Sequence, residues 1–239
     1  MKKNRIVKFI TLGVVLLLAL LFVARFGGPS ILRLYLETGI GNCKKIPILC
    51  MAPQEGVVEL DINKEYFAEL HPYKFPKATI AVPTGFDVIQ ETIKKVYYKK
   101  KKSPHPGAAV YLLYEPPNFF IELFPQLKKQ GINNNYAFIK HLMYAQLQNT
   151  RNLTDTFFVI MKSIFTPDLG DQNRVNMVQF KLADKKGFIN YNLAGSDNYF
   201  DCNVVSNEGD FFKIYIRDNG ATLDLNQVLA IISMTDKIS

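Results

Sequence analysis

The sequence predicts an α+β fold, in which an antiparallel β-sheet packs with helices as an α-β-α sandwich and one transmembrane helix precedes the domain. Three observations support this fold: four apolar runs separated by short turns, amphipathic segments around them, and a long apolar run at the amino terminus. We expect a basic cytoplasmic tail over 1–8, an anchor over 9–26, a juxtamembrane helix and cysteine-containing neck over 27–55, and one globular domain over 56–239.

The amino-terminal segment predicts a membrane anchor. Residues Phe9 to Ala24 are apolar and uncharged, and as a helix they would span about 24 Å, slightly less than a hydrocarbon core. The flanking Lys8 and Arg25 can reach toward the headgroups and complete the span. More basic residues precede the run than follow it, so the amino terminus is expected in the cytoplasm and the domain outside it. A signal peptide cleaved near Ser30, giving a secreted protein, is the alternative.

The formal net charge of +8 does not indicate nucleic-acid binding. Of the 29 lysines and arginines, five lie in the amino-terminal segment, which leaves 24 against 21 acidic residues in the rest of the chain. A mild excess of this size is ordinary for a soluble domain. We therefore expect no nucleic-acid partner.

The segment after the anchor predicts a helix and a neck. Gly27-Gly-Pro29 interrupts the first helix, and Pro29 suits the first turn of a second one that ends near Thr38. This helix carries an apolar face that can lie on lipid or dock on the domain, and docking is favoured because few basic residues accompany it. The face consists of Ile31, Leu32, Tyr35 and Leu36.

If the domain is exported, two of its three cysteines can pair. In an oxidising compartment, Cys43 and Cys50 can close a short loop as a disulfide, and Cys202 is then left as a buried thiol inside a predicted strand. The alternative is that all three are simply small apolar residues. No metal site is expected, because there is no second cysteine pair and the three histidines are scattered.

The first half of the domain predicts short elements. Asn63 can cap a short helix, and a strand is expected on each side of it, over Val57–Asp61 and Lys77–Val82. Ala108–Tyr114 and Phe119–Phe124 are expected to form a hairpin. Residues 86–98 fit either a helix or a strand.

The second half predicts a long helix over Asn133–Asn149 and then a segment, 154–165, that fits a helix capped by Thr154 or a strand. A four-stranded antiparallel meander follows, because short turn clusters separate successive apolar runs. A last helix should begin near Asp224 and cover one face of the sheet. The four runs are Val175–Ala183, Phe188–Ala194, Tyr199–Ser206 and Phe211–Arg217.

The order of these elements resembles the PsbP-like superfamily, which includes small envelope proteins of the DcrB type. The resemblance rests on the strand Ala78–Phe86, the helix from Tyr136 to Gln148, the meander from Asn176 to Ile216 and the closing Val228–Ser233. It implies an α-β-α sandwich that usually serves as a non-enzymatic binding or accessory module, with no shared catalytic residues. The extra helix near Thr154 and the cysteine neck depart from that pattern.

One dense run of positive charge is a candidate site for lipid headgroups or another anionic ligand, because Tyr97 and Tyr98 lie between its lysines. A solvated loop over Lys99–Lys102 is the simpler interpretation. The candidate residues are Lys94, Lys95, Lys99, Lys100, Lys101 and Lys102.

These features predict a membrane-anchored extracytoplasmic binding or accessory module with a protein partner in the envelope. The chain lacks Gly-x-Ser-x-Gly, His-Glu-x-x-His and the phosphate-binding glycine motifs, so no catalytic, cofactor-binding or metal-binding residue is assigned. Two alternatives are an envelope hydrolase whose carboxylates meet only in the fold, and a structural subunit of a membrane complex.

Overall fold

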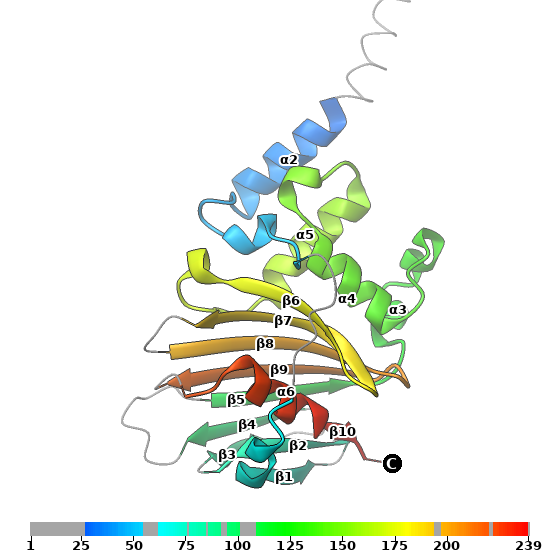
Figure 1. The fold of residues 1–239 in the computed structure, drawn as a ribbon. Helices are drawn as coiled ribbons and strands as arrows, with labels where there is room; N and C mark the ends of the chain where they lie inside the picture. Colours follow the sequence, from blue (N-terminus) through cyan, green and yellow to red (C-terminus); the bar gives the residue numbers. More distant parts are fainter. Residues whose placement is uncertain are drawn as a thin grey trace, which may run out of the picture. The chain divides into compact units, whose positions relative to one another are not determined.

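The structure is a computed structural model that describes residues 27–54, 62–75, 77–84, 86–91, 95–100, 109–193, 197–219 and 222–238 (Figure 1). By its internal contacts the chain divides into two compact units. The first unit contains the residues up to Cys50 together with Ala145–Ile164, and the second contains Met51–Tyr144 and Phe165–Ser239.

The predicted α+β class is confirmed, because antiparallel sheets pack against helices. The predicted anchor over 9–26 and the predicted strand Val57–Asp61 lie outside the described residues. Within the described ranges, no helix combines the length and the apolarity that crossing a membrane requires.

The first unit contains the predicted juxtamembrane helix and two further segments. Helix α2 has Pro29 in its first turn, and Arg33 Nε donates to Glu37 Oε1 at 3.0 Å. A small apolar cluster joins the elements through Leu36, Leu49, Leu147 and Val159. The elements are α2 (Gly28–Gly39), η2 (Pro47–Cys50), η5 (Leu147–Asn149) and α5 (Leu153–Phe165), whose last residue belongs to the second unit.

The apolar face expected on this helix divides in the structure. Leu36 is buried in the cluster, whereas Ile31 and Tyr35 are 60% and 68% exposed. Successive residues on a helix are 100° apart, so one side of the predicted face turns inward and the other turns to solvent. The predicted docking is therefore correct for Leu36 and wrong for Ile31 and Tyr35.

The ambiguous segment 154–165 is helical. Helix α5 begins one residue earlier than predicted, and its cap is Asn152, whose Oδ1 accepts from the backbone N–H of Asp155 at 2.9 Å. Thr154 is therefore not the cap. A side-chain amide oxygen at Asn152 satisfies a first-turn N–H that has no partner within the helix.

The second unit is built on a seven-stranded antiparallel sheet with the order β3-β4-β5-β9-β8-β7-β6. Its last four strands form the predicted meander. A smaller sheet has the order β1-β2-β10. The strands are β1 (Leu70–Phe75), β2 (Ala78–Pro83), β3 (Phe86–Glu91), β4 (Lys95–Lys100), β5 (Ala109–Glu115), β6 (Asn176–Lys181), β7 (Lys185–Leu193), β8 (Asp197–Ser206), β9 (Phe211–Asn219) and β10 (Asp236–Lys237).

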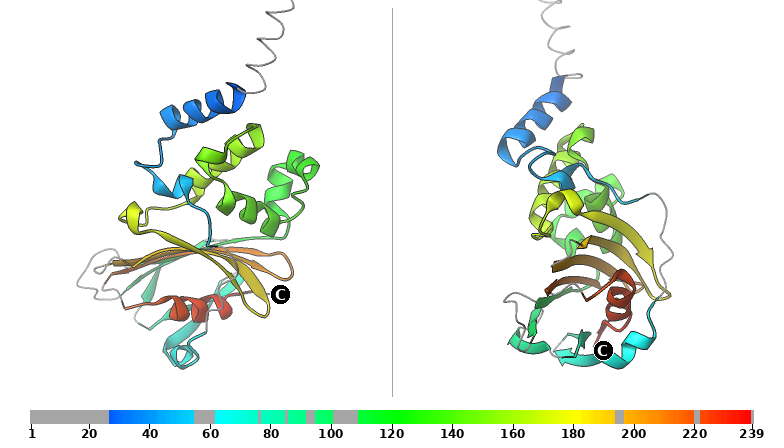
Figure 2. Two further views of the ribbon diagram at one scale, coloured as in Figure 1. Left: turned by 45° about the horizontal axis from the view of Figure 1, so that its top comes forward. Right: turned by 60° about the vertical axis from the view of Figure 1, so that its left-hand side comes forward.

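Helices lie on both faces of the large sheet within the second unit, and Figure 2 shows α4 and α6 on opposite sides. One face packs against α6 and the small sheet in a continuous apolar core. Lys185 joins α6 to this face, because its Nζ donates to the carbonyl of Ser233 at the helix end. The helices are α3 (Phe119–Leu123), α4 (Asn135–Tyr144), α6 (Leu225–Ser233) and the 3₁₀ helices η3 (Glu65–Glu69), η4 (Pro125–Gln130) and η6 (Gln172–Arg174).

The predicted hairpin after Glu115 is wrong, because Phe119–Leu123 form helix α3. Pro116 and Pro117 cannot continue a ladder, and Asn118 turns the chain with a φ of 63°. The free side of β5 pairs with β9 instead, about a hundred residues further along. The rings of Phe120 and Phe138 are stacked, with their centroids 4.3 Å apart.

The remaining elements agree with the expectation in part. Residues 86–98 fall largely in two paired strands, β3 and β4, so the strand interpretation is correct. Strand β1 was not predicted, and the long helix ends at Tyr144. Asn63 does cap a short helix, accepting from the N–H of Tyr66 at 3.1 Å, and Asp224 caps α6 in a capping box.

Candidate functional site

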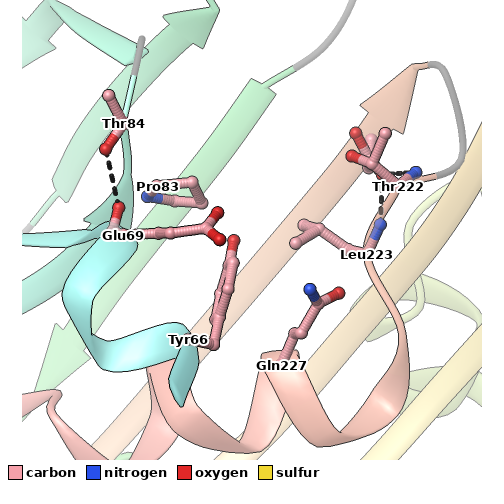
Figure 3. A pocket seen from close by; sticks show the side chains of 8 residues that line it. Tyr66, Glu69, Pro83, Thr84, Thr222, Leu223 and Gln227 are labelled. Carbon is pink, nitrogen blue, oxygen red and sulfur yellow. Dashed lines mark hydrogen bonds between the residues drawn. The ribbon is translucent and has the colours of Figure 1, made fainter. Parts of the chain in front are cut away.

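A pocket of about 140 Å³ in the second unit is the first candidate site (Figure 3). It lies where four chain segments meet: η3, the end of β2, the end of β9 and the start of α6. We call it the η3–α6 pocket. Its lining residues are Tyr66, Glu69, Pro83, Thr84, Asp218, Thr222, Leu223 and Gln227.

Hydrogen bonds to backbone atoms hold one side of the η3–α6 pocket. The carbonyl of Glu69, at the end of η3, accepts from the backbone N–H of Thr84 at 2.9 Å and from its hydroxyl at 2.8 Å. The same hydroxyl lies 3.1 Å from Nε2 of His71. These contacts join η3 to the end of β2 and leave the Glu69 side chain directed along the pocket (Figure 3).

Asp218 organises the other side. Its Oδ2 accepts from the backbone N–H of Thr222 at 2.6 Å, the N–H of Leu223 at 2.7 Å and the Thr222 hydroxyl at 3.1 Å. The residue is 1% exposed. The three donors hold the turn before α6, and their hydrogen bonds stabilise the negative charge of the buried carboxylate.

The start of α6 is also satisfied internally. Asp224 Oδ1 accepts from the backbone N–H of Gln227 at 2.8 Å, and Gln227 Oε1 accepts from the N–H of Asp224 at 2.9 Å. In this capping box each residue satisfies an N–H of the other. The helix terminus therefore does not offer these two groups to an anion in the pocket.

Tyr66 places a hydroxyl in the pocket from a side chain that is 95% buried. No residue in the described part of the chain is hydrogen-bonded to that hydroxyl. In Figure 3 it lies beside the carboxyl end of Glu69. Burial raises the pKa of Tyr66 most, and nearby carboxylates raise it further, namely those of Glu69, Asp218 and Asp224. The hydroxyl is therefore neutral at physiological pH and stands in a negative environment.

A second candidate is a layer of buried polar side chains on the sheet face opposite α6. Lys213 Nζ lies 2.7 Å from Asp201 Oδ1 and donates to Asn203 Oδ1 at 3.3 Å. Asp201 Oδ2 accepts from Asn190 Nδ2 at 3.1 Å. We call Asn190, Asn192, Asp201, Asn203 and Lys213 the polar layer.

The polar layer is best explained as a structural network. Its groups bond mainly to one another or to backbone, as when Asn192 Nδ2 donates to the carbonyl of Leu169 at 2.8 Å. A buried ion pair such as Lys213–Asp201 contributes little net stability, but a packing that separates its charges is strongly unfavourable. This layer therefore favours one register of β7, β8 and β9 over its alternatives.

The predicted disulfide is present: Cys43 and Cys50 are bonded, with their Cα atoms 5.6 Å apart. Cys202 is a buried thiol in β8, as expected, and burial raises its pKa. The pairing of Cys43 with Cys50 and the burial of Cys202 are therefore both as predicted.

The predicted lysine site is only partly described. Lys94, Lys101 and Lys102 lie outside the described residues. Lys95, Lys99 and Lys100 belong to strand β4, so the expectation that a loop begins at Lys99 is wrong. The ladder to β5 continues through Lys99, which pairs with Ala109, and this pairing favours the strand over the loop.

Sequence reasoning did not find the η3–α6 pocket. Two of its local signals were visible, since Asn63 and Asp224 are both recognisable caps. That their helices meet is a property of the tertiary structure alone, because η3 and α6 are about 160 residues apart. Tyr66 looked like one apolar residue among others on a short helix.

In the described ranges, no group of three or more His, Cys, Asp or Glu side chains is placed to hold a metal ion. No protein-family model matches the chain, and no curated protein matches it. The resemblance to the PsbP-like superfamily therefore stays a prediction.

Proposed function

We propose that this protein is a binding module anchored in a membrane by its amino-terminal helix, with its domain outside the cytoplasm. The observation that carries the proposal is the Cys43–Cys50 disulfide. Structural disulfides persist in oxidising compartments and are rare in the cytosol. The disulfide follows an apolar run with a basic flank, which is the order expected of a signal anchor.

Helix α2 supports a position next to lipid. Ile31 and Leu34 are each 60% exposed and Tyr35 is 68% exposed. Spacings of three and four residues put these side chains on one side of the helix. The apolar run Phe9–Ala24 ends four residues before α2 begins, so a membrane is the nearest apolar medium for that side.

The binding role is supported by the combination of a rigid sheet, a small polar pocket and the absence of known catalytic motifs from the sequence. We infer that the second unit is an α-β-α sandwich of the kind the resemblance implies, with α4 on one face and α6 on the other. The partner is an envelope protein or a small ligand of the η3–α6 pocket.

A hydrolase receives limited support from the structure. Glu69 and Asp218 do line one pocket, as an acid–base pair would require. Asp218 Oδ2, however, already accepts three hydrogen bonds that hold the turn before α6, and protonating the carboxylate would weaken them. A structural subunit of a membrane complex is the other alternative.

The proposal is tested by fractionating cells that express the full chain with a carboxy-terminal tag. We expect the tag in the membrane fraction, accessible to protease added outside the cytoplasmic membrane, with Cys43 and Cys50 resistant to alkylation until reduction. A Cys43→Ser/Cys50→Ser variant controls for labelling of Cys202. A domain that is soluble, shielded from protease and reduced in the cell would contradict the proposal.

A further inference from the structure

We propose that the η3–α6 pocket binds a primary ammonium group, either of a small alkylamine or of a lysine side chain on a partner. This inference assigns a ligand class to the binding role proposed above and rests on that role. It depends on four features of the pocket: an unpartnered hydroxyl on a buried side chain, the sign of the surrounding charge, the closed helix terminus and the size of the cavity.

The hydroxyl of Tyr66 lacks a partner in the described part of the chain, although the side chain is 95% buried. Solvent, the neighbouring Glu69 carboxylate or a ligand in the pocket can supply a hydrogen bond, because the hydroxyl faces this space (Figure 3). Its oxygen can accept from an ammonium N–H, which is a pure donor.

The pocket is negative. Its described lining contains two carboxylates, from Glu69 and Asp218, and no lysine or arginine. Asp224 adds a third negative group close enough to act on Tyr66. A carboxylate that lies beside a neutral hydroxyl can bind an ammonium through a charge-assisted hydrogen bond, which is about twice as strong as a neutral one.

An anionic ligand fits the same pocket poorly. A helix terminus normally attracts anions through its free N–H groups, but here Asp224 and Gln227 satisfy each other in the capping box. The turn before the helix is likewise closed, because Asp218 accepts the N–H groups of Thr222 and Leu223. An incoming carboxylate or phosphate would meet acidic side chains and few donors.

The size and the walls favour a short alkylammonium. A cavity of about 140 Å³ has room for on the order of five water molecules, which matches an ammonium with about four methylene groups. Pro83 and Leu223 supply apolar surface for the methylenes. The head would lie at Glu69 and Tyr66, and the chain would lie along Pro83 and Leu223.

The experiment titrates n-butylammonium chloride into the purified full chain in detergent and measures binding by calorimetry. We expect saturable binding that n-butanol and butyrate do not reproduce and that weakens with added salt, because the charge on Glu69 is exposed to screening. Equal binding of the alcohol or of butyrate, or no saturation by n-butylammonium, overturns the proposal.

Three variants locate the site. Glu69→Gln should weaken binding about tenfold or more, since it removes a charge-assisted bond, and Tyr66→Phe should weaken it several-fold. Glu65→Gln is the matched control, because Glu65 lies on the same 3₁₀ helix and does not line the pocket. Binding that Glu69→Gln leaves intact would overturn the assignment.

Circular dichroism establishes that each variant is folded. Glu69 is exposed, so replacing it with Gln should not affect folding.

Two probes distinguish the sources of the ammonium group. A peptide with one central lysine should bind more tightly than n-butylammonium if the ligand is a partner's side chain, and more weakly if it is a free amine. A peptide with norleucine in place of lysine should not bind in either case, and its binding would contradict an ammonium site. The titration uses purified protein, so its outcome does not depend on where the protein is located in the cell. A failure to bind n-butylammonium and a failure to fractionate with membranes are therefore separate results.

Discussion

Gly187 illustrates how a single residue is determined by its surroundings. It was expected in the turn between two strands, but it lies inside β7 opposite Val204. A Cβ atom built on it would lie 1.9 Å from the backbone oxygen of Asn203. That oxygen belongs to the neighbouring strand, so it cannot move without disturbing the ladder.

We therefore predict that Gly187→Ala destabilises the second unit by about 3 kcal/mol or more, because the clash is with backbone. Gly39→Ala is the control: Gly39 ends α2 and a Cβ there has nothing within 4 Å, so the change should be neutral or slightly stabilising. Urea unfolding followed by circular dichroism measures both. Equal stability of the two variants would show that β7 does not approach β8 as described.

At the scale of elements, helix α5 contains a buried cation. Lys162 is 0% exposed and donates from Nζ to the carbonyl of Ala145 at 2.9 Å. Desolvation lowers the pKa of Lys162 to about 7. Lys162 therefore changes its protonation state near neutral pH.

This pKa predicts a pH dependence of stability. The unfolded chain keeps the proton up to about pH 10.5, whereas the folded chain releases it near pH 7, so between these values the unfolded state binds more protons. Stability should therefore rise with pH from about 7 to about 10, by a few kcal/mol.

The measurement is urea unfolding of the full chain at several pH values between 6.5 and 9.5. Lys162→Met should remove most of the slope in that window. Lys44→Met, which changes an exposed lysine in the same unit, should leave the slope unchanged. An identical slope in wild type and Lys162→Met would contradict the burial of this side chain.

At the scale of the whole molecule, the membrane segment and helix α2 make a joint prediction. The chain contains no tryptophan, so Tyr35→Trp introduces a single fluorescent reporter on the exposed side of α2. In vesicles of phosphatidylcholine and phosphatidylglycerol, we expect blue-shifted emission that brominated lipid quenches, because an indole prefers the interface.

Leu193→Trp is the matched control, because Leu193 is 47% exposed on β7 and should remain unquenched. Quenching at both positions would indicate adsorption without orientation. No quenching at either position would leave α2 without a lipid contact and would contradict the role proposed for its exposed side.

Much of the fold follows from local patterns in the sequence. The four strands of the meander were predicted within a few residues, because apolar alternation and short turns are encoded over about ten residues. For the same reason, Asn63 was predicted as a cap, the last helix was predicted to begin near Asp224, and Cys43 and Cys50 were recognised as a possible pair, since a helix start or a short disulfide loop involves neighbours in the chain.

The candidate site could not be predicted in this way. Tyr66 and Glu69 come from one end of the domain sequence and Asp218 from the other, and no local signal links them. The segment Phe119–Phe124 has a strand-like composition, yet β9 pairs with the edge of β5 that this segment would have used in a hairpin. Pairing of this kind depends on long-range competition, which strand propensity does not measure.

Patterns of residue type at short spacing were enough to predict the fold class, the meander, the Asn63 cap and the possible pairing of Cys43 with Cys50, but they misplaced the cap of α5 at Thr154. Contacts between distant segments account for the helix at Phe119–Leu123, the division of the α2 face, the burial of Lys162 and the η3–α6 pocket. The physical reason is the same in each case. Burial and strand pairing depend on which distant segment offers the more complementary surface. That segment changes the environment of a side chain without changing the local sequence pattern around it.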